Sequence, residues 1–268
     1  MRLGIVGCGS IGRTVAKRLV AFAPVTSVAL FDLEPGKAEA LAKLHRRYRA
    51  VGSLAALVAA SDFVLEAASP QAARSVGPAA VRAGKEVLFM SLGALADDRL
   101  WSTLRRQASK SGARIHIPSG ALAGLEAVAS ASAARLTEVT LTTRKPPRAL
   151  KGVAYLESRG VDLDRIRLPT EVFSGTARAA VQHFPANINV AAALALAAIG
   201  FEKTRVVIIA DPAARTNRHE VVARGDFGEL HCEVSNLPFP DNPKTSYLAA
   251  LSAVATVRNA ASRVHFGP

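Results

Sequence analysis

The first 118 residues alternate between short apolar runs and longer stretches in which apolar residues recur every three or four positions. Short apolar runs bounded by polar residues are typical of buried parallel strands, and the longer recurrence is typical of the helices that cover them. The pattern predicts strands over 3–6, 27–31, 48–51, 62–68, 86–90 and 114–117. It predicts helices over 13–22, 35–45, 53–60, 71–83 and 97–111, and leaves open a break at Gly77-Pro78. Such alternation predicts a parallel, doubly wound α/β sheet.

The pattern changes after Pro118. Helices are expected over 119–134, 176–184, 187–199 and 247–261, the last begun by residues 242–246. Strands are expected over 138–143, 171–175, 205–210, 220–224 and 229–234. Their clean alternation of apolar and polar residues predicts a second α/β domain with a mixed or antiparallel sheet and helices on one face.

A glycine-rich segment joins the first strand to the first helix. It reads Gly7-Cys8-Gly9-Ser10-Ile11-Gly12, the pattern G-x-G-x-x-G. Between a strand and a helix this pattern predicts a dinucleotide-binding site. Gly7 permits the tight turn, Gly9 lets the backbone approach a pyrophosphate, and Gly12 lets the helix pack closely on the strand. Ser10 and Ile11 lie at the helix start, where free N–H groups and the positive dipole end favour phosphates.

Two further strand ends complete this site. Asp32 follows the second strand about twenty residues after Gly12, where a carboxylate can accept hydrogen bonds from the ribose hydroxyls. Because it would repel a 2′-phosphate, we expect NAD rather than NADP, with NADP left possible. Ala68 ends another strand, and its small side chain leaves room for the nucleotide. We therefore divide the chain into a dinucleotide-binding domain (1–118), a substrate and dimerisation domain (119–241) and a C-terminal helix (242–268) that packs back on the first domain.

Composition narrows the class of protein. The chain has 268 residues and a net charge of +13, and half of its residues are hydrophobic. The Lys and Arg residues are scattered through predicted helices without a basic tail, so we favour solvated helix faces over nucleic-acid binding. No apolar run is long enough to span a membrane. Two cysteines form neither a disulfide framework nor a metal-site spacing, and we expect a cytoplasmic, metal-free protein.

Histidine is the side chain best suited to moving protons near neutral pH, and the chain has six. His219 alone stands among polar neighbours, Asn217 and Glu220, at an expected junction between loop and strand. On these grounds His219 is a candidate acid or base, and a structural histidine is the alternative.

Several motifs of the second half share one resemblance. They are Ser119-Gly120-Ala121-Leu122-Ala123-Gly124, Arg144-Lys145-Pro146-Pro147, Phe173-Ser174-Gly175-Thr176-Ala177, Phe184-Pro185-Ala186-Asn187-Ile188-Asn189-Val190-Ala191, Ala210-Asp211-Pro212, Asn217-Arg218-His219-Glu220 and Asn242-Pro243-Lys244-Thr245-Ser246. Together, from residue 1 to about residue 260, the chain resembles the L-aspartate dehydrogenase family. The resemblance implies NAD(P)-dependent oxidative deamination of L-aspartate to iminoaspartate, which yields oxaloacetate and ammonia or enters NAD biosynthesis. It also implies a homodimer with a Rossmann domain and a mixed α/β domain.

The same resemblance assigns residues to roles. It implies that His219 is the catalytic histidine and that Ala123 and Asn189 contact the nicotinamide cofactor. Lys145, Asn187 and Lys244 lie in the family's turns and are candidates for binding the substrate carboxylates, although surface or capping roles are alternatives. A related dehydrogenase or imine reductase for another amino acid, or a non-catalytic NAD-binding regulator, are the competing interpretations.

Overall fold

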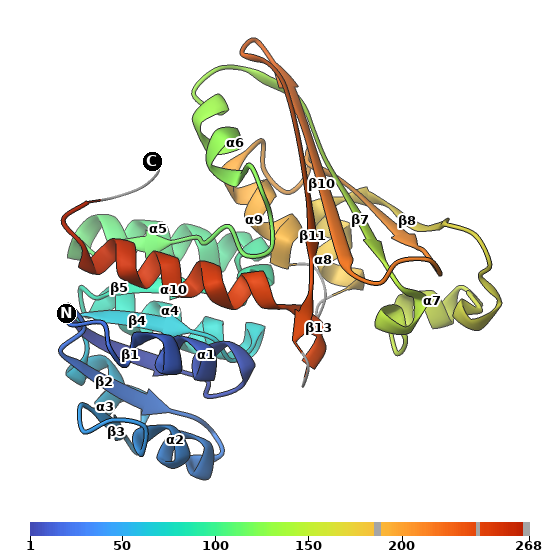
Figure 1. Ribbon diagram of the computed structural model, residues 1–268. Helices are drawn as coiled ribbons and strands as arrows, with labels where there is room; N and C mark the ends of the chain where they lie inside the picture. Colours follow the sequence, from blue (N-terminus) through green and yellow to red (C-terminus); the bar gives the residue numbers. More distant parts are fainter. Residues whose placement is uncertain (185–188, 240–241, 265–268) are drawn as a thin grey trace. The chain divides into compact units, whose positions relative to one another are not determined.

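The computed structural model describes residues 1–184, 189–239 and 242–264 (Figure 1). The chain forms two compact units, and each is described by itself. The first contains residues 1–118 and the C-terminal segment from Ala249, and the second contains residues 119–248.

The first unit is built on a six-stranded sheet in which all strands are parallel. Its strands are β1 (Arg2–Val6), β2 (Ser27–Phe31), β3 (Tyr48–Ala50), β4 (Phe63–Glu66), β5 (Glu86–Phe89) and β6 (Ile115–His116). Their order is β3-β2-β1-β4-β5-β6. This order reverses between β1 and β4, as in the Rossmann fold, so the expected doubly wound sheet is confirmed.

Helices connect these strands. They are α1 (Ser10–Leu19), α2 (Pro35–Ala42), α3 (Leu54–Ala60), α4 (Pro70–Arg82), η1 (Leu92–Ala96) and α5 (Asp98–Ser111). Side chains of Ser53, Ser69 and Asp97 cap α3, α4 and α5 by accepting hydrogen bonds from N–H groups of the first turn. Helix α4 continues through Pro78 without a break. Gly77 fits there because a Cβ would lie 2.6 Å from the Phe89 ring.

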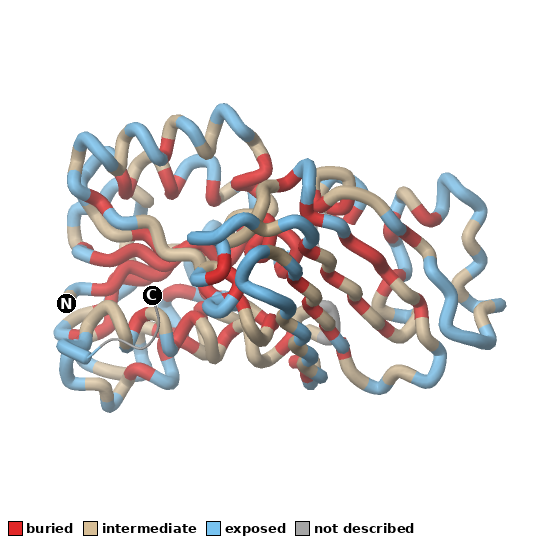
Figure 2. The backbone as a smooth tube through the Cα atoms, turned by 90° about the horizontal axis from the view of Figure 1, so that it is seen from above, coloured by how far each residue is buried: buried red, intermediate tan, exposed pale blue. Residues whose placement is uncertain are grey.

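The C-terminal helix α10 (Tyr247–Ala261) has the bounds that the apolar pattern predicts. Ala253, Val254 and Val257 join the hydrophobic core of the first unit, beside Leu3 and Leu30 of the sheet. Burial follows the strands and the inner faces of the helices (Figure 2). The segment 242–246 is a strand and not the expected helix start: β13 (Asn242–Ser246) pairs with β12 (Pro238–Phe239).

The second unit contains a mixed five-stranded sheet, which confirms the expected second fold class. Its strands are β7 (Leu136–Lys145), β8 (Thr170–Thr176), β9 (Arg205–Ala210), β10 (Asn217–Gly225) and β11 (Gly228–Asn236). The order is β11-β10-β7-β9-β8; β7 and β9 are parallel, and the other neighbours are antiparallel. Helices α6 (Leu125–Ala131), α8 (Ala177–His183) and α9 (Asn189–Ala197) lie along one face (Figure 1).

Two regions of the second unit differ from expectation. Helix α6 is shorter than 119–134 because Gly120 and Gly124 have positive φ angles of 61° and 76° and interrupt the chain before Leu125. The segment between β7 and β8, for which the sequence predicted no element, contains η2 (Pro147–Leu150), α7 (Ala154–Ser158) and η3 (Leu163–Arg165).

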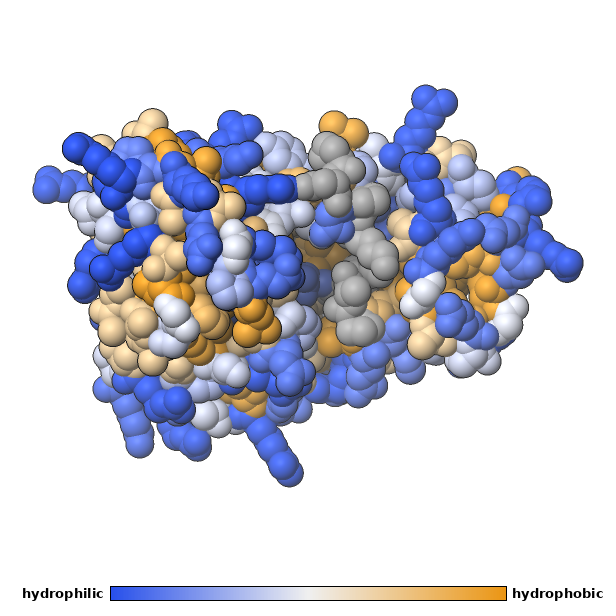
Figure 3. All heavy atoms as spheres, turned by 90° about the horizontal axis from the view of Figure 1, so that it is seen from below, coloured by the Kyte–Doolittle hydropathy of each residue, from blue (hydrophilic) through white to orange (hydrophobic). Residues whose placement is uncertain are grey.

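Hydrophilic side chains project from much of the face shown in Figure 3. Several surface arginines are paired with carboxylates, among them Arg2 with Asp62 and Arg224 with Glu138 and Glu229. Among the helices of the described ranges, none is long and apolar enough to cross a membrane.

Candidate functional site

The glycine-rich loop has the geometry that its sequence predicts. Gly7 has φ 92° and donates its N–H to the Phe31 carbonyl at 2.9 Å. A Cβ would lie 2.6 Å from the Ala67 carbonyl oxygen at Gly7 and 1.9 Å from the Gly7 carbonyl oxygen at Gly12. Gly9 differs, because a Cβ there would meet no atom within 4 Å. Gly7 and Gly12 therefore shape the turn, while Gly9 leaves open space beside the backbone.

Helix α1 begins directly after Gly9. Ser10 and Ile11 are half-buried in its first turn, and no side chain caps the helix. Asp32 follows β2 beside the same loop: its Oδ2 accepts from the Cys8 N–H at 2.7 Å and its Oδ1 from the Glu34 N–H at 2.9 Å. Each oxygen retains a lone pair for a ligand hydroxyl. The loop, the helix start and Asp32 thus form one surface suited to a dinucleotide.

Glu66 is a part of this region that the sequence did not reveal. It ends β4 with no exposed surface. Its Oε1 accepts from the N–H groups of Ala68 and Ser69 at 2.9 and 3.1 Å and from the Ser91 hydroxyl at 3.0 Å, and its Oε2 accepts from the Ser91 N–H at 3.0 Å. Burial raises the pKa of this carboxyl, and the hydrogen bonds oppose that shift. Glu66 therefore ties the loop that contains Ala68 to the end of β5.

Cys8 lies within the loop but is protected. Its side chain is buried, and burial together with the charge of Asp32 raises the pKa of the thiol to about 12. A thiol with such a pKa is not a nucleophile at neutral pH. Cys8 is thus a packing residue under the loop.

The second unit contains a cluster of buried polar side chains. The cluster lies at one end of a sheet face that is otherwise apolar. His219 pairs with Thr143 across β10 and β7, and Lys145 lies two residues farther on β7. Since side chains two residues apart share a face, these three polar groups continue the buried face formed by Leu141 and Val221. His219 is 2% exposed and Lys145 is 4% exposed.

His219 lies inside β10 and not at the expected junction with a loop. Its Nδ1 is 3.0 Å from the Thr143 Oγ1. Burial and then the charge of Lys145 lower the pKa of His219 to about 3, and burial lowers the pKa of Lys145 to about 8. The imidazole is therefore neutral at physiological pH.

Two buried asparagine side chains adjoin the cluster that contains His219 and Lys145. The Asn217 Nδ2 donates to the Ser246 Oγ at 3.3 Å, and the Asn236 Nδ2 donates to the Ala121 carbonyl at 2.9 Å. Asn236 faces Asn217 across β11 and β10. Neither amide was predicted to bind another segment of the chain. The two amides fix β13 and the turn before α6 to the end of the sheet at which His219 lies.

Of the remaining expected residues, Ala123 and Asn189 are fully described. Ala123 is half-buried in the turn before α6, and Asn189 is the exposed first residue of α9. Asn187 lies outside the described residues. Lys244 is in β13, but its side chain is outside the part of the chain that the structure describes.

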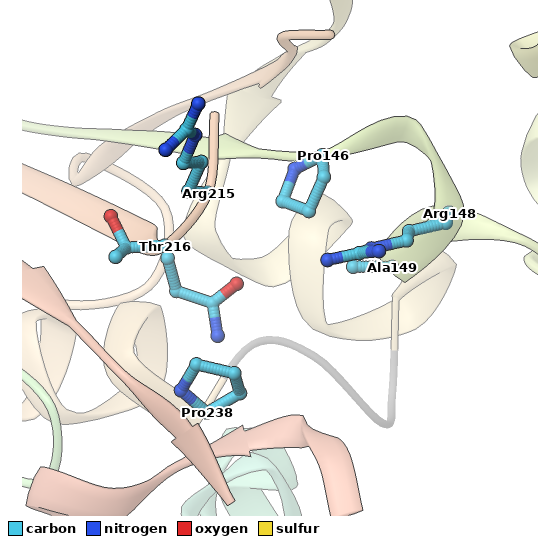
Figure 4. Close-up of a pocket in the computed structure, with 7 residues that line it drawn as sticks. Pro146, Arg148, Ala149, Arg215, Thr216 and Pro238 are labelled. Atoms are coloured by element: carbon cyan, nitrogen blue, oxygen red, sulfur yellow. The ribbon is translucent and has the colours of Figure 1, made fainter. Parts of the chain in front are cut away.

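A pocket of about 380 Å³ opens beside the cluster (Figure 4). It is lined by the turn that follows Lys145, by residues 215–217 and by Pro238. Asn217 belongs both to the pocket lining and to the buried polar face. In the described ranges, no group of three His, Cys, Asp or Glu side chains is placed to hold a metal ion.

Comparisons with known proteins agree with both units. Residues 126–260 match the family model described as aspartate dehydrogenase, C-terminal, and residues 7–118 match the NAD-binding domain of homoserine dehydrogenase. The chain is 44% identical over 267 residues to the L-aspartate dehydrogenase of Methanocella arvoryzae, covering 99% of each chain. It is 37% identical over 260 residues to that of Nitrosopumilus maritimus, covering 96% of this chain and 95% of the other.

A solved structure shows the same similarity. The aspartate dehydrogenase of Thermotoga maritima aligns with a TM-score of 0.76 at 28% identity, covering 100% of this chain and 99% of the other. A homoserine dehydrogenase from Thiobacillus denitrificans shares the fold, with a TM-score of 0.61 at 16% identity over 97% of this chain and 73% of the other.

Proposed function

The chain belongs to the L-aspartate dehydrogenase family, and from this premise we propose that it oxidises L-aspartate at the α-carbon with NAD as the acceptor. The α-carbon loses a hydride and the ammonium group loses a proton, which gives iminoaspartate and a reduced nicotinamide. Water then adds to the imine and releases oxaloacetate and ammonia, or the imine is used for NAD biosynthesis. The bound nicotinamide supplies the hydride acceptor.

The glycine loop supports the cofactor part of this proposal. Open space beside Gly9 admits a pyrophosphate, and the uncapped start of α1, at Ser10 and Ile11, offers N–H groups to it. Asp32 is the basis for preferring NAD, because its carboxylate would repel a 2′-phosphate. Ala68, Ala123 and Asn189 are the other cofactor contacts that we propose.

The observation that carries the catalytic part is the buried pair of His219 and Lys145 on one sheet face. We assign the proton steps to His219: with a proton on Nδ1, donated to Thr143, its Nε2 accepts the substrate ammonium proton, releases it to solvent, and then accepts a proton from the attacking water. The Lys145 ammonium holds the α-carboxylate. A carboxylate on Lys145 offsets the charge that lowers the pKa of His219, so substrate binding makes the imidazole a stronger base. Asn187 and Lys244 remain candidate substrate contacts.

The test is the absorbance of reduced nicotinamide on mixing the protein with L-aspartate and NAD or NADP. We expect turnover with aspartate, a higher kcat/KM with NAD, and a loss of at least about 10²-fold in kcat for His219→Gln with an unchanged Kd for NADH. His231→Gln is the matched control, because His231 is exposed and pairs with Glu220 on the neighbouring strand. Turnover of another amino acid but not of aspartate would overturn the assignment of L-aspartate as the substrate. NAD binding without turnover of any amino acid would favour a regulator. Full activity of His219→Gln would remove its role.

The proposal also includes a cytoplasmic homodimer. The family resemblance supports the dimer, and two free cysteines, Cys8 and Cys232, fit a reducing compartment. Light scattering of the purified protein and fractionation of the source cells test these two points.

A further inference from the structure

The pocket beside Asn217 has the chemistry of an anion-binding site. Its described lining residues include two arginines, Arg148 and Arg215, and among these described residues none is acidic. In Figure 4 the Arg148 side chain extends toward the space between Pro146 and Pro238, whereas that of Arg215 extends away from this space. The Arg148 guanidinium is therefore directed toward a ligand that binds in the pocket.

Arg148 lies in an ordered turn, and its side chain is exposed. It belongs to η2, in which the Ala149 N–H donates to the Pro146 carbonyl at 2.9 Å and Leu150 is buried. Within the described ranges no carboxylate forms an ion pair with Arg148, in contrast to Arg218, which is paired with Glu233. A guanidinium without such a partner retains its planar set of donors for a ligand carboxylate.

The pocket is continuous with the proposed catalytic face. Asn217 lines the pocket and lies two residues before His219 on β10, with both side chains buried on the same face. Two residues of a strand span about 6.8 Å. Pro146 lines the other side and directly follows Lys145. Asn217 is therefore shared by the pocket lining and the sheet face that carries His219, and Lys145 is the neighbour in sequence of a second lining residue.

We propose that Arg148 binds the side-chain carboxylate of the substrate and selects dicarboxylic amino acids over those with a single carboxylate. This inference rests on the proposed function, because it takes His219 and Lys145 as the reacting end of the site. Lys145 and Arg148 then divide the two carboxylates between a buried ammonium and a guanidinium at the pocket wall. A substrate with an apolar side chain leaves the guanidinium without an anion and gains nothing from it.

The test compares Arg148→Met and Arg148→Lys with the wild type on L-aspartate and on L-alanine. We expect Arg148→Met to lower kcat/KM for aspartate by about 10- to 100-fold, mainly through KM, with no change for alanine. Arg148→Lys should recover part of the loss, because it restores charge but not the planar donor pair. Arg218→Met is the matched control: it removes the same charge from a residue next to His219 whose partner is Glu233, and the aspartate preference should remain.

A second readout separates this inference from the proposed function. Succinate has both carboxylates but no amine, and its binding is measured by calorimetry without turnover. A weaker succinate Kd in Arg148→Met supports the inference, even if the wild type does not oxidise aspartate and the proposed function fails. An unchanged succinate Kd, or an equal loss of kcat/KM for aspartate and alanine, would overturn it.

Discussion

Replacement of Gly9 by alanine separates the fold of the glycine loop from its proposed binding of the cofactor. Gly9 has φ −74° and ψ −157°, which alanine adopts without strain, and its added Cβ meets no atom within 4 Å. The folded protein therefore tolerates the methyl group. Because alanine has less conformational freedom in the unfolded chain, we expect Gly9→Ala to raise the free energy of unfolding by about 0.4–1 kcal/mol.

The same methyl group should weaken cofactor binding. If the pyrophosphate lies against the Gly9 backbone, the added carbon occupies the space that the phosphate oxygens need. Overpacking by one methyl group costs about 1–3 kcal/mol, which corresponds to a Kd for NADH roughly 5- to 150-fold higher. The N–H groups at the start of α1 are unchanged, so the loss measures the close approach alone.

Fluorescence titration with NADH gives the Kd, and urea unfolding gives the stability. Gly36→Ala is the matched control, since Gly36 also faces open space but lies in α2; it should leave the Kd unchanged. Gly12→Ala is the opposite control, because its Cβ would lie 1.9 Å from the Gly7 carbonyl oxygen and should destabilise the fold. A wild-type Kd in Gly9→Ala would refute the placement of the pyrophosphate, and a loss of stability would refute the tolerance of the loop.

Three other expectations follow from buried groups. At pH 8 iodoacetamide should label Cys232 and spare Cys8, whose pKa is raised to about 12; peptide mass spectrometry showing rapid labelling of Cys8 in the folded protein would contradict this. The pKa of His219 is about 3 in the folded protein against 6.5 ordinarily, so the unfolded chain takes up the proton first and stability falls as pH decreases from 6.5 toward 3. Over pH 4–7 the free energy of unfolding of His219→Gln, measured in urea, should depend less on pH than that of the wild type. An equal pH dependence of the two proteins would show that His219 is not its cause. Glu66→Ala removes the acceptor of three backbone N–H groups and should lower the free energy of unfolding by about 3 kcal/mol; a loss below about 1 kcal/mol would show that water replaces the carboxylate.

The first unit could be predicted closely because its signals are local. The apolar run before Gly7 and the helical pattern after Gly12 locate the loop between them, and near-continuous apolar runs are typical of strands buried on both faces of a parallel sheet. Helix α10 was equally clear from its apolar residues. Glu66 was missed because its hydrogen bonds come from the neighbouring loop and from Ser91, which only the sheet brings together.

The site of the second unit was harder to predict, because polar residues in an alternating strand usually indicate its solvent face. Thr143 and Asn217 are exceptions: both are in phase with the buried residues of their strands, Leu141 and Val221. If the alternation of buried and exposed residues is continued to the strand ends, it places Thr143 and Asn217 on the same buried face as His219 and Lys145. The pocket could not be predicted at all, since Arg148 belongs to a short helix that begins at the second of two prolines and has no periodic pattern.

Burial lowers the pKa of Lys145 to about 8, and an anion that binds against Lys145 would oppose this shift. Burial disfavours the charged form of both Lys145 and His219, and the charge of Lys145 further opposes protonation of His219. A carboxylate placed against Lys145 stabilises its ammonium form, so binding above pH 8 must be accompanied by proton uptake. If Lys145 binds the substrate carboxylate as we propose, the affinity of the protein for the anion should decrease as the pH rises above the pKa of about 8 of Lys145.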